Sequence, residues 1–388
     1  MPSIAIGLPE CGFLEDLPNV TFADVTTTAY ATVKLDNVTL LSNIRLTPDK
    51  SNRIVIYAKP MIRSLVPLTG PKPITTLLPM LQVQLRVGTT NLSTSCAVVP
   101  GGTDSPERID EAWFTHNFLT WQPQIIETTR LQPQWLAYIS TSRFKRSIIS
   151  SVLYTRDGRR FEKDLFSSFG SSALYFRQVQ TDFMHLWGDE CERQDLDPIA
   201  YDVFGKGTNS IELTQTADLT SGEQVPMNPV LVTRYAQRYI LRPERFNDVC
   251  FGFENTLGGF DTLMLEGKQT FQPEGDVTTF KTEAVEKELV NNFTSIWEAN
   301  TGRLETERAA TQFQDFLKST NRYIFRSGAW RKIIVSEYKV KHYRGESNSY
   351  SFKYHLAERA EGRFFDRAQL PELELPTKFF PKYDYKKM

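Results

Sequence analysis

The sequence predicts a mainly β protein with tandem β-sandwich units of immunoglobulin-like type, followed by a C-terminal β unit that carries one α-helix. Three observations support this fold class. The segment 248–265 alternates apolar and other side chains on both sides of Gly258-Gly259, which is the pattern of a β-hairpin. Short alternating segments recur along the chain between turn residues. Clear helical periodicity is confined to residues 305–318, where Ala309, Phe313 and Phe316 share one face.

Composition limits the class of protein. The chain has 388 residues, of which 40% are hydrophobic and 23% are charged, as in a soluble globular protein of two or three domains. The formal net charge is -1, so no overall field favours nucleic acid or a membrane surface. The first residues do not resemble a signal peptide, and no apolar run approaches the ~20 residues that cross a bilayer. We therefore expect synthesis in a cytoplasm, no membrane insertion and no nucleic-acid partner.

Turn-rich segments divide the chain into five predicted regions. These are an extended N-terminal arm (1–22), a first β-sandwich domain (23–117), a second β-sandwich domain (118–267), a C-terminal β domain with the helix (268–370) and a C-terminal arm (371–388).

Two hairpins outside the first domain are predicted in more detail. Asp157-Gly158 predicts a type I′ turn between two strands, and the hairpin at 248–265 is expected to close the second domain near Gly267. Residues 275–301 show no single pattern. After the helix, alternation from Ser336 and again from Tyr350 predicts a long antiparallel hairpin.

The C-terminal arm combines three prolines with four aromatic residues, Phe379, Phe380, Tyr383 and Tyr385. Proline favours extended backbone, so the arm cannot bury these rings by itself. Either it packs on its own domain, or it contacts a neighbouring subunit. As a candidate subunit-contact arm, its deletion (371–388) should weaken assembly and leave the monomer folded.

No motif indicates a catalytic, cofactor or metal site. Cys11, Cys96, Cys191 and Cys250 are far apart, which argues against a zinc site and indicates ordinary thiols in a reducing compartment. The acidic and histidine-bearing segment 185–192 is interpreted as a polar surface loop, because a metal needs ligands aimed at one point.

Paired carboxylates and basic residues are present but also have ordinary explanations. Asp195 with Asp197, or Glu254 with Asp261, would serve a glycosidase only at a suitable separation. Basic residues between aromatics would suit nucleic acid, but on alternating strands they are typical of the solvent face of a sheet. These basic residues are Arg331, Lys332, Lys339, Lys341, Arg344 and Lys353.

The segment from about 118 to 366 resembles a family of tail and tail-tip structural proteins of phages and prophages of Bacteroidota. The resemblance is carried by Phe118–Pro123 (FLTWQP), Tyr239–Pro243 (YILRP), Phe253–Asp261 (FENTLGGFD), Asn300–Gly302 (NTG), Asp315–Ser319 (DFLKS), Tyr323, Trp330–Val335 (WRKIIV), Tyr338–Val340 (YKV) and Tyr350–Tyr354 (YSFKY). None of these motifs is catalytic, so the resemblance transfers no active residue.

The resemblance implies a non-enzymatic virion protein of the tail or tail tip that is assembled in the bacterial cytoplasm. Copies of the chain would form a ring or collar through β domains and extended arms, together with other tail proteins. The alternative is a β module that binds a host surface glycan or receptor through aromatic side chains exposed on one concave face. A polysaccharide hydrolase is a third reading, and it would need a convergent carboxylate pair in a cleft.

Overall fold

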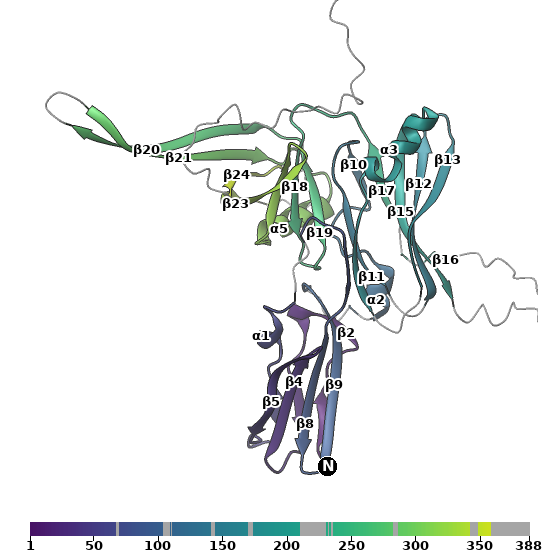
Figure 1. Ribbon diagram of the computed structural model, residues 1–388, viewed down its shortest axis with the longest axis vertical. Helices are drawn as coiled ribbons and strands as arrows, with labels where there is room; N and C mark the ends of the chain where they lie inside the picture. The colour runs from purple at the N-terminus through teal and green to yellow at the C-terminus, as the bar shows by residue number, and fades with distance from the viewer. Residues whose placement is uncertain are drawn as a thin grey trace, which may run out of the picture.

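The computed structural model describes residues 1–66, 70–103, 109, 111–140, 144–169, 174–209, 230–231, 233, 236–281, 286–341 and 348–357. These described residues form five sheets in three units, and a long two-stranded ribbon projects from the third unit (Figure 1). The predicted fold class, mainly β with tandem sandwich units and a C-terminal β unit that carries a helix, is confirmed.

The first unit is a β-sandwich. Its smaller sheet has the order β1 (Ser3–Ile6), β3 (Val20–Ala23), β6 (Ile54–Ile56), and its larger sheet has the order β2 (Cys11–Phe13), β9 (Thr90–Val99), β8 (Met80–Val87), β4 (Ala29–Leu35), β5 (Val38–Leu46). The short helices η1 (Leu14–Asp16) and α1 (Lys59–Ile62) complete it. Alternate residues of β4 and β8 point inward, and Phe22 from the smaller sheet shares one core with Val33 and Val83 from the larger.

Residues 1–22 do not form the predicted extended arm. β1 pairs with β3, and β2 pairs in parallel with β9, so this segment lies within the two sheets of the sandwich. The side chains of Phe13 and Val20 are buried. The proline and glycine residues that indicated an arm instead mark the connections between these short strands.

The second unit combines two sheets with a helix. The larger sheet has the order β10 (Ile125–Thr128), β17 (Gln237–Leu241), β15 (Pro198–Asn209), β12 (Phe144–Thr155), β13 (Arg160–Phe169), and β16 (Val230–Leu231) also pairs with β15. The smaller sheet has the order β11 (Trp135–Ser140), β14 (Tyr175–Gln180), β7 (Ile74–Leu77). Helix α3 (Phe183–Gln194) packs on the larger sheet through Trp187, and α2 (Glu111–His116) lies between the first and second units in sequence.

Two details of the second unit differ from the prediction. Strand β7 comes from the region assigned to the first sandwich, yet it pairs with β14. The β12–β13 hairpin is confirmed, but its turn is not type I′. Gly158 has a positive φ of 85° whereas Asp157 does not, and Gly158 N–H donates to the Thr155 carbonyl at 3.0 Å. This is the geometry of a type I turn followed by a left-handed glycine.

The third unit is one large antiparallel sheet with a helix on one face. The order is β19 (Phe260–Leu265), β18 (Val249–Glu254), β22 (Arg322–Arg326), β23 (Ala329–Lys339), β24 (Ser351–Leu356), β21 (Glu286–Asn300), β20 (Gln269–Lys281). Helix α5 (Glu307–Lys318) confirms the predicted helix and buries Phe313 and Phe316 against the sheet. Thr306 caps it by accepting the Ala309 N–H at 3.1 Å. The predicted hairpin after the helix is confirmed as β23 and β24.

The β18–β19 hairpin belongs to the third unit and does not close the second. Its pairing and its glycine turn are as predicted, but β18 also pairs with β22. The boundary predicted near Gly267 therefore falls inside one sheet. The hairpin's own alternation could not indicate which neighbour it joins, because strand pairing between distant segments leaves no local pattern.

Candidate assembly interface and the junction that supports it

The turn between β18 and β19 lies where the three units meet. The Gly102 N–H, just after the first sandwich, donates to the Thr256 carbonyl at 2.6 Å. Asn255 Nδ2 donates to the carbonyl of Leu119, at the start of the second unit, at 2.9 Å. One buried apolar cluster contains residues from all three units, and Leu257 is the member from this turn. The turn of the β18–β19 hairpin, which the sequence predicts most clearly, is thus the junction of the three units.

Two glycines allow the backbones to approach each other at this joint. Gly101 and Gly258 have positive φ values of 101° and 83°, which side chains rarely adopt. A Cβ at Gly258 would overlap the Pro100 carbonyl, and a Cβ at Gly101 would overlap the Thr256 carbonyl. The contact between the first and third units therefore depends on the absence of side chains at both positions.

A buried carboxyl group joins the second and third units beside this turn. Asp261 on β19 accepts a hydrogen bond from the Thr120 hydroxyl at 2.6 Å and another from the Trp121 N–H at 2.9 Å. Burial raises the pKa of Asp261 to about 7, and the nearby Asp315 carboxyl also raises it, although the hydrogen bonds act in the opposite direction. This carboxyl group consequently exchanges its proton near neutral pH.

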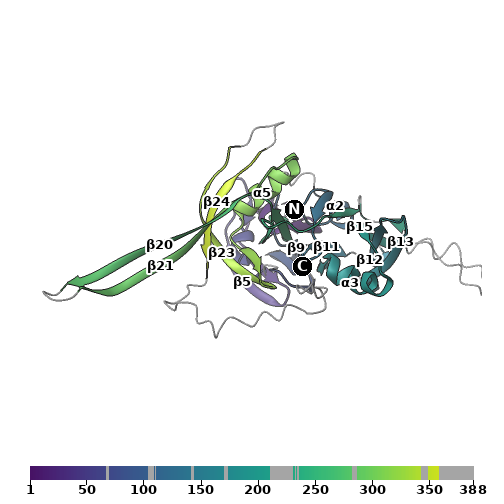
Figure 2. The same ribbon diagram turned by 90° about the horizontal axis from the view of Figure 1, so that it is seen from above.

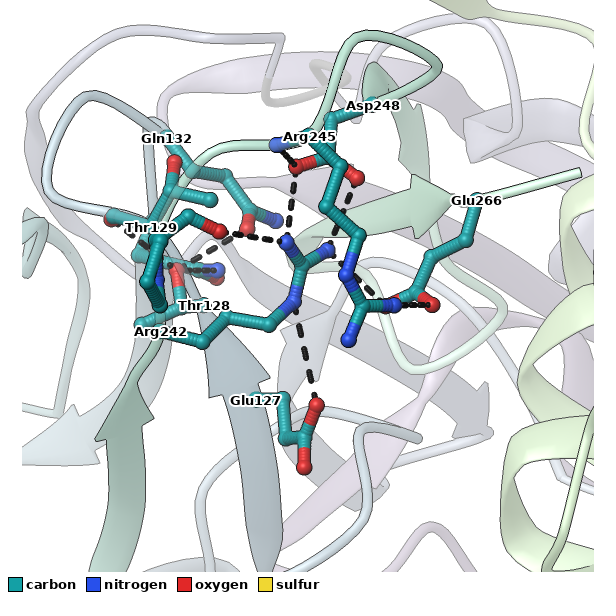
Figure 3. Close-up of polar contacts among 10 residues, drawn as sticks. Glu127, Thr128, Thr129, Gln132, Arg242, Arg245, Asp248 and Glu266 are labelled. Atoms are coloured by element: carbon teal, nitrogen blue, oxygen red, sulfur yellow. Dashed lines mark hydrogen bonds and ion pairs between the residues drawn. The ribbon is translucent and has the colours of Figure 1, made fainter.

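A cluster of ion pairs forms a second connection between the second and third units (Figure 3). Arg242 follows β17 and donates to both carboxylate oxygens of Asp248 at 2.7 and 2.9 Å and to Glu266 at 2.8 Å. Its Nε lies 3.7 Å from the carboxylate of Glu127 on β10. Burial opposes ionisation of Asp248, but hydrogen bonds from Arg242 and from the Arg245 N–H outweigh burial and lower its pKa.

The ribbon of β20 and β21 is the main projecting feature of the molecule (Figures 1 and 2). The two strands pair from Gln269 with Ala299 to Lys281 with Glu286. Strand β21 also pairs with β24, but only over residues 297–300. Among the described residues, the rest of the ribbon pairs only with itself. In both views the ribbon extends away from the second unit, and the rest of the third unit lies between them.

Aromatic stacking fixes the ribbon where it leaves the sheet. Trp297 lies between Phe271 and Tyr354, with ring centroids 5.3 and 5.9 Å apart. The Arg326 guanidinium lies 4.9 Å from the Trp297 ring centroid and donates to the Tyr354 hydroxyl at 3.0 Å. Phe271 remains 52% exposed, so an apolar surface continues from the core onto the ribbon.

The residues singled out in the sequence are placed as follows. Phe379, Phe380, Tyr383 and Tyr385 lie outside the described residues. The segment 185–192 is not a loop as predicted, because it lies in helix α3. Asp182 caps this helix by accepting the His185 N–H at 2.9 Å, and Leu186 and Trp187 are buried in the core. The cap and the apolar face were local signals that could have indicated a helix.

The candidate carboxylate pair and the cysteines show no shared site in the described part of the chain. Asp261 lies directly opposite Phe253, so the adjacent Glu254 points to the other face of the sheet. Burial raises the pKa of Cys96, Cys191 and Cys250, which keeps these thiols protonated. Within the described ranges, no three His, Cys, Asp or Glu residues are grouped to hold a metal ion.

Exposed aromatic residues are scattered over the described surface. Tyr30 and Tyr57 lie in the first unit, Phe246 lies in the turn before β18, and Phe271 and Tyr338 lie on different strands of the third unit. The larger aromatic cluster around Trp330 packs ring against ring, with Phe260 at 5.4 Å and Phe325 at 5.2 Å. These rings therefore pack on one another.

Comparisons with known proteins add no functional assignment. No protein-family model matches the chain, and no curated protein matches it. Among solved structures, a chimeric titin Z1Z2 tandem has a TM-score of 0.16 and 9% identity, covering 63% of this chain and 100% of the other. The structure of Rst D1-D2 has a TM-score of 0.19 and 9% identity, covering 62% and 99%. These TM-scores are too low to carry an argument.

No helix in the described ranges has the length and apolar character needed to span a membrane.

Proposed function

We propose that the protein is a non-enzymatic structural subunit of a bacteriophage tail or tail tip, which assembles with copies of itself and other tail proteins into a symmetric ring or collar. The observation that carries the self-assembly is the β20–β21 ribbon, which extends from the body and, among the described residues, has no third strand up to residue 296 of β21. The tail location is supported by the resemblance of the segment 118–366 to phage tail proteins.

A free ribbon of this length favours a protein partner. A two-stranded ribbon without a third strand or a packing surface is marginally stable in water. Its outer strand also presents unpaired backbone groups that another chain can use. β20 is the last strand of its sheet, so its outer edge is such a surface. Contact with a neighbouring subunit would complete the hydrogen bonding and cover the exposed ring of Phe271.

The second copy of this chain is the partner that fits the arrangement. The root of the ribbon is held by stacked rings and Arg326, and the third unit is connected to the second by the Asp261 and Arg242 contacts. If the ribbon has the same orientation in every copy, it makes the same contact with each neighbouring subunit. A closed symmetric assembly requires such equivalent contacts. The alternative of glycan recognition has less support, because the exposed aromatic residues lie in different units of the chain.

The first experiment tests whether the ribbon mediates assembly. The full chain and a variant in which residues 274–294 are replaced by Asn-Gly would be compared by size-exclusion chromatography with light scattering and negative-stain microscopy. We expect the full chain to form rings and the shortened variant to remain a folded monomer, as judged by its thermal unfolding. Rings formed equally well by the shortened variant would contradict the role of the ribbon.

Single substitutions provide a matched comparison at the ribbon root. Phe271→Ser removes a ring that is 52% exposed, and Tyr57→Ser removes a ring that is 58% exposed on the first unit. We expect only Phe271→Ser to weaken assembly. Equal effects would indicate a general loss of solubility or folding.

The virion assignment needs a separate test. Particles of a phage that encodes this chain would be purified and analysed by mass spectrometry, and antibody labelling would then locate the chain by electron microscopy. We expect the chain in the particle, with label on the tail. Its absence from intact particles would contradict the assignment even if purified protein forms rings.

A further inference from the structure

The turn between β17 and β18, residues 243–247, presents a fully exposed phenyl ring. Phe246 has a relative accessibility of 104%, the largest of any phenylalanine in the described residues. A single exposed apolar side chain is common on protein surfaces and does not by itself indicate a contact. The backbone that carries this ring, however, is fixed by several hydrogen bonds.

Hydrogen bonds hold the turn at both ends (Figure 3). Asp248 accepts the Arg245 N–H at 2.7 Å, and the Asp248 N–H donates to the Arg245 carbonyl at 3.0 Å. Arg242 donates to the Pro243 carbonyl at 3.0 Å and to Asp248, and the Arg245 side chain bonds to Glu266. An aromatic side chain on a pre-ordered backbone loses little entropy on docking, which is typical of interface anchors.

The surroundings of Phe246 carry an excess of negative charge. Two arginines, Arg242 and Arg245, face the three carboxylates of Glu127, Asp248 and Glu266, and Glu244 is a further exposed carboxylate within the turn. The turn therefore suits a partner surface that is apolar and basic, and it does not suit an anionic membrane.

The far end of β23 has the complementary character. Tyr338 is 56% exposed, and Lys339 and Lys341 beside it are also exposed. Glu337 is already paired with Lys353 at 2.9 Å, so among the described residues the two lysines give this end of the strand a positive charge. Tyr338 and Lys339 point to opposite faces of the sheet, but after Ile333 no described strand pairs with β23 on the β22 side, so both side chains flank an open edge. We call this edge, with Tyr338, Lys339 and Lys341, the β23 end.

The register of the sheet places the two surfaces far apart on one chain. Phe253 of β18 is paired with Arg322, which is paired with Ile333 of β23, so β18 and β23 run in the same direction. The Phe246 turn precedes Val249, whereas Tyr338 lies well beyond the level of Phe253. At ~3.3 Å per residue, Val249 and Tyr338 are separated by roughly 30 Å along the strands.

We propose that the Phe246 turn of one copy docks on the β23 end of the next copy, with Phe246 against Tyr338 and the acidic turn beside Lys339 and Lys341. Two different surfaces at opposite ends of one unit give a head-to-tail contact, and a head-to-tail contact that closes produces a ring. This inference deepens the proposed self-assembly and rests on it.

Cysteine cross-linking tests the contact directly. Phe246→Cys and Tyr338→Cys chains would be purified separately, mixed under assembly conditions and treated with a short bis-maleimide. The native cysteines are buried, and unmodified chain reports any reaction they make. We expect cross-linked pairs mainly in the mixture. Cross-linking of Phe246→Cys chains with each other, or no more reaction than Tyr57→Cys gives with Tyr338→Cys, would overturn the proposal.

A second measurement uses self-association in sedimentation velocity. We expect Phe246→Ala to weaken association about tenfold or more, as loss of an interface anchor does, and Tyr57→Ala to leave it unchanged. Phe246→Ala chains that associate like the unmodified protein would overturn this contact. If such chains still form ribbon-dependent rings, the proposed function stands and only the contact fails. A chain that is absent from virions would instead overturn the function.

Discussion

The Thr120 hydroxyl of the second unit donates a 2.6 Å hydrogen bond to the Asp261 carboxyl of the third unit, in a site that excludes water. The Thr120 oxygen also accepts a hydrogen bond from the Gln122 N–H at 3.0 Å, so this hydroxyl acts as an acceptor as well as a donor. If Asp261 is protonated, its own O–H can donate to Thr120 while its other oxygen still accepts the Trp121 N–H. The neutral acid thus satisfies the same contacts without a buried charge.

The pKa of Asp261 makes stability depend on pH. Because that pKa is about 7 in the folded protein and 3.8 ordinarily, the folded state holds a proton in this window that the unfolded chain has released. The free energy of unfolding should therefore fall as pH rises from about 4 to about 7. The full rise in pKa corresponds to about 4 kcal/mol. Urea denaturation over this pH range measures the trend.

Asp261→Asn imitates the protonated acid, because its amide can donate to Thr120 and accept from Trp121. We expect the variant to be less sensitive to pH than the unmodified chain and to be the more stable of the two at about pH 8. Burial also raises the pKa of Glu254, which adds a trend of the same sign in both proteins. The difference in unfolding free energy between the two proteins, followed against pH, reports on Asp261 alone. If the two free energies change in parallel, Asp261 does not titrate in this range.

Gly258→Ala should separate the first unit from the third. Gly258 and Gly158 have nearly equal φ values of 83° and 85°, but space around Gly158 is open. We expect Gly158→Ala to cost about 1 kcal/mol of backbone strain. Gly258→Ala should cost about 3 kcal/mol or more, because its Cβ also overlaps the Pro100 carbonyl. Thermal unfolding of both variants gives the comparison, and equal losses would show that the close approach is unimportant.

Arg242→Gln should leave buried carboxylates without their cation. The Arg242 and Asp248 side chains are each only 8% exposed, so we expect a loss of about 3 kcal/mol. Arg156 provides a matched control, because its ion pair with Asp197 is largely exposed. Arg156→Gln should change the free energy of unfolding by less than about 1 kcal/mol. Chemical denaturation of both variants tests the difference. A small effect at Arg242 would mean that the second and third units do not depend on this cluster.

Local patterns predicted the elements that bury one face. Alternation identified the β18–β19 hairpin with its Gly258 turn, and the 3.6-residue period identified the helix that became α5. The alternation that starts at Tyr350 likewise identified β24. The structure of such a segment can be predicted from its own residues, because one of its sides is apolar and the other is polar.

The ribbon and the junction could not be predicted in this way. Up to residue 296, the strands of the ribbon pair only with each other among the described residues, so no further strand of the sheet constrains their sequence. The joint depends on pairs such as Asp261 with Thr120 and Gly258 with Pro100, which are distant in sequence. Strand β7 likewise joins a sheet whose other strands follow it by many residues. Contacts between distant segments need the fold before they can be recognised.

Hydrogen exchange should separate the ribbon root from the rest of the ribbon. Amides near Trp297 lie between β20 and β24 and beside stacked rings, so we expect them to exchange slowly in the monomer. Amides of 274–281 and 286–293 are paired only across the ribbon and should exchange faster. On assembly, a neighbouring copy should slow exchange in these two segments, while amides of the β4–β5 hairpin provide an internal reference. Mass spectrometry of deuterated monomer and ring fractions measures both states. Unchanged exchange in the ribbon on ring formation would show that the subunits join elsewhere.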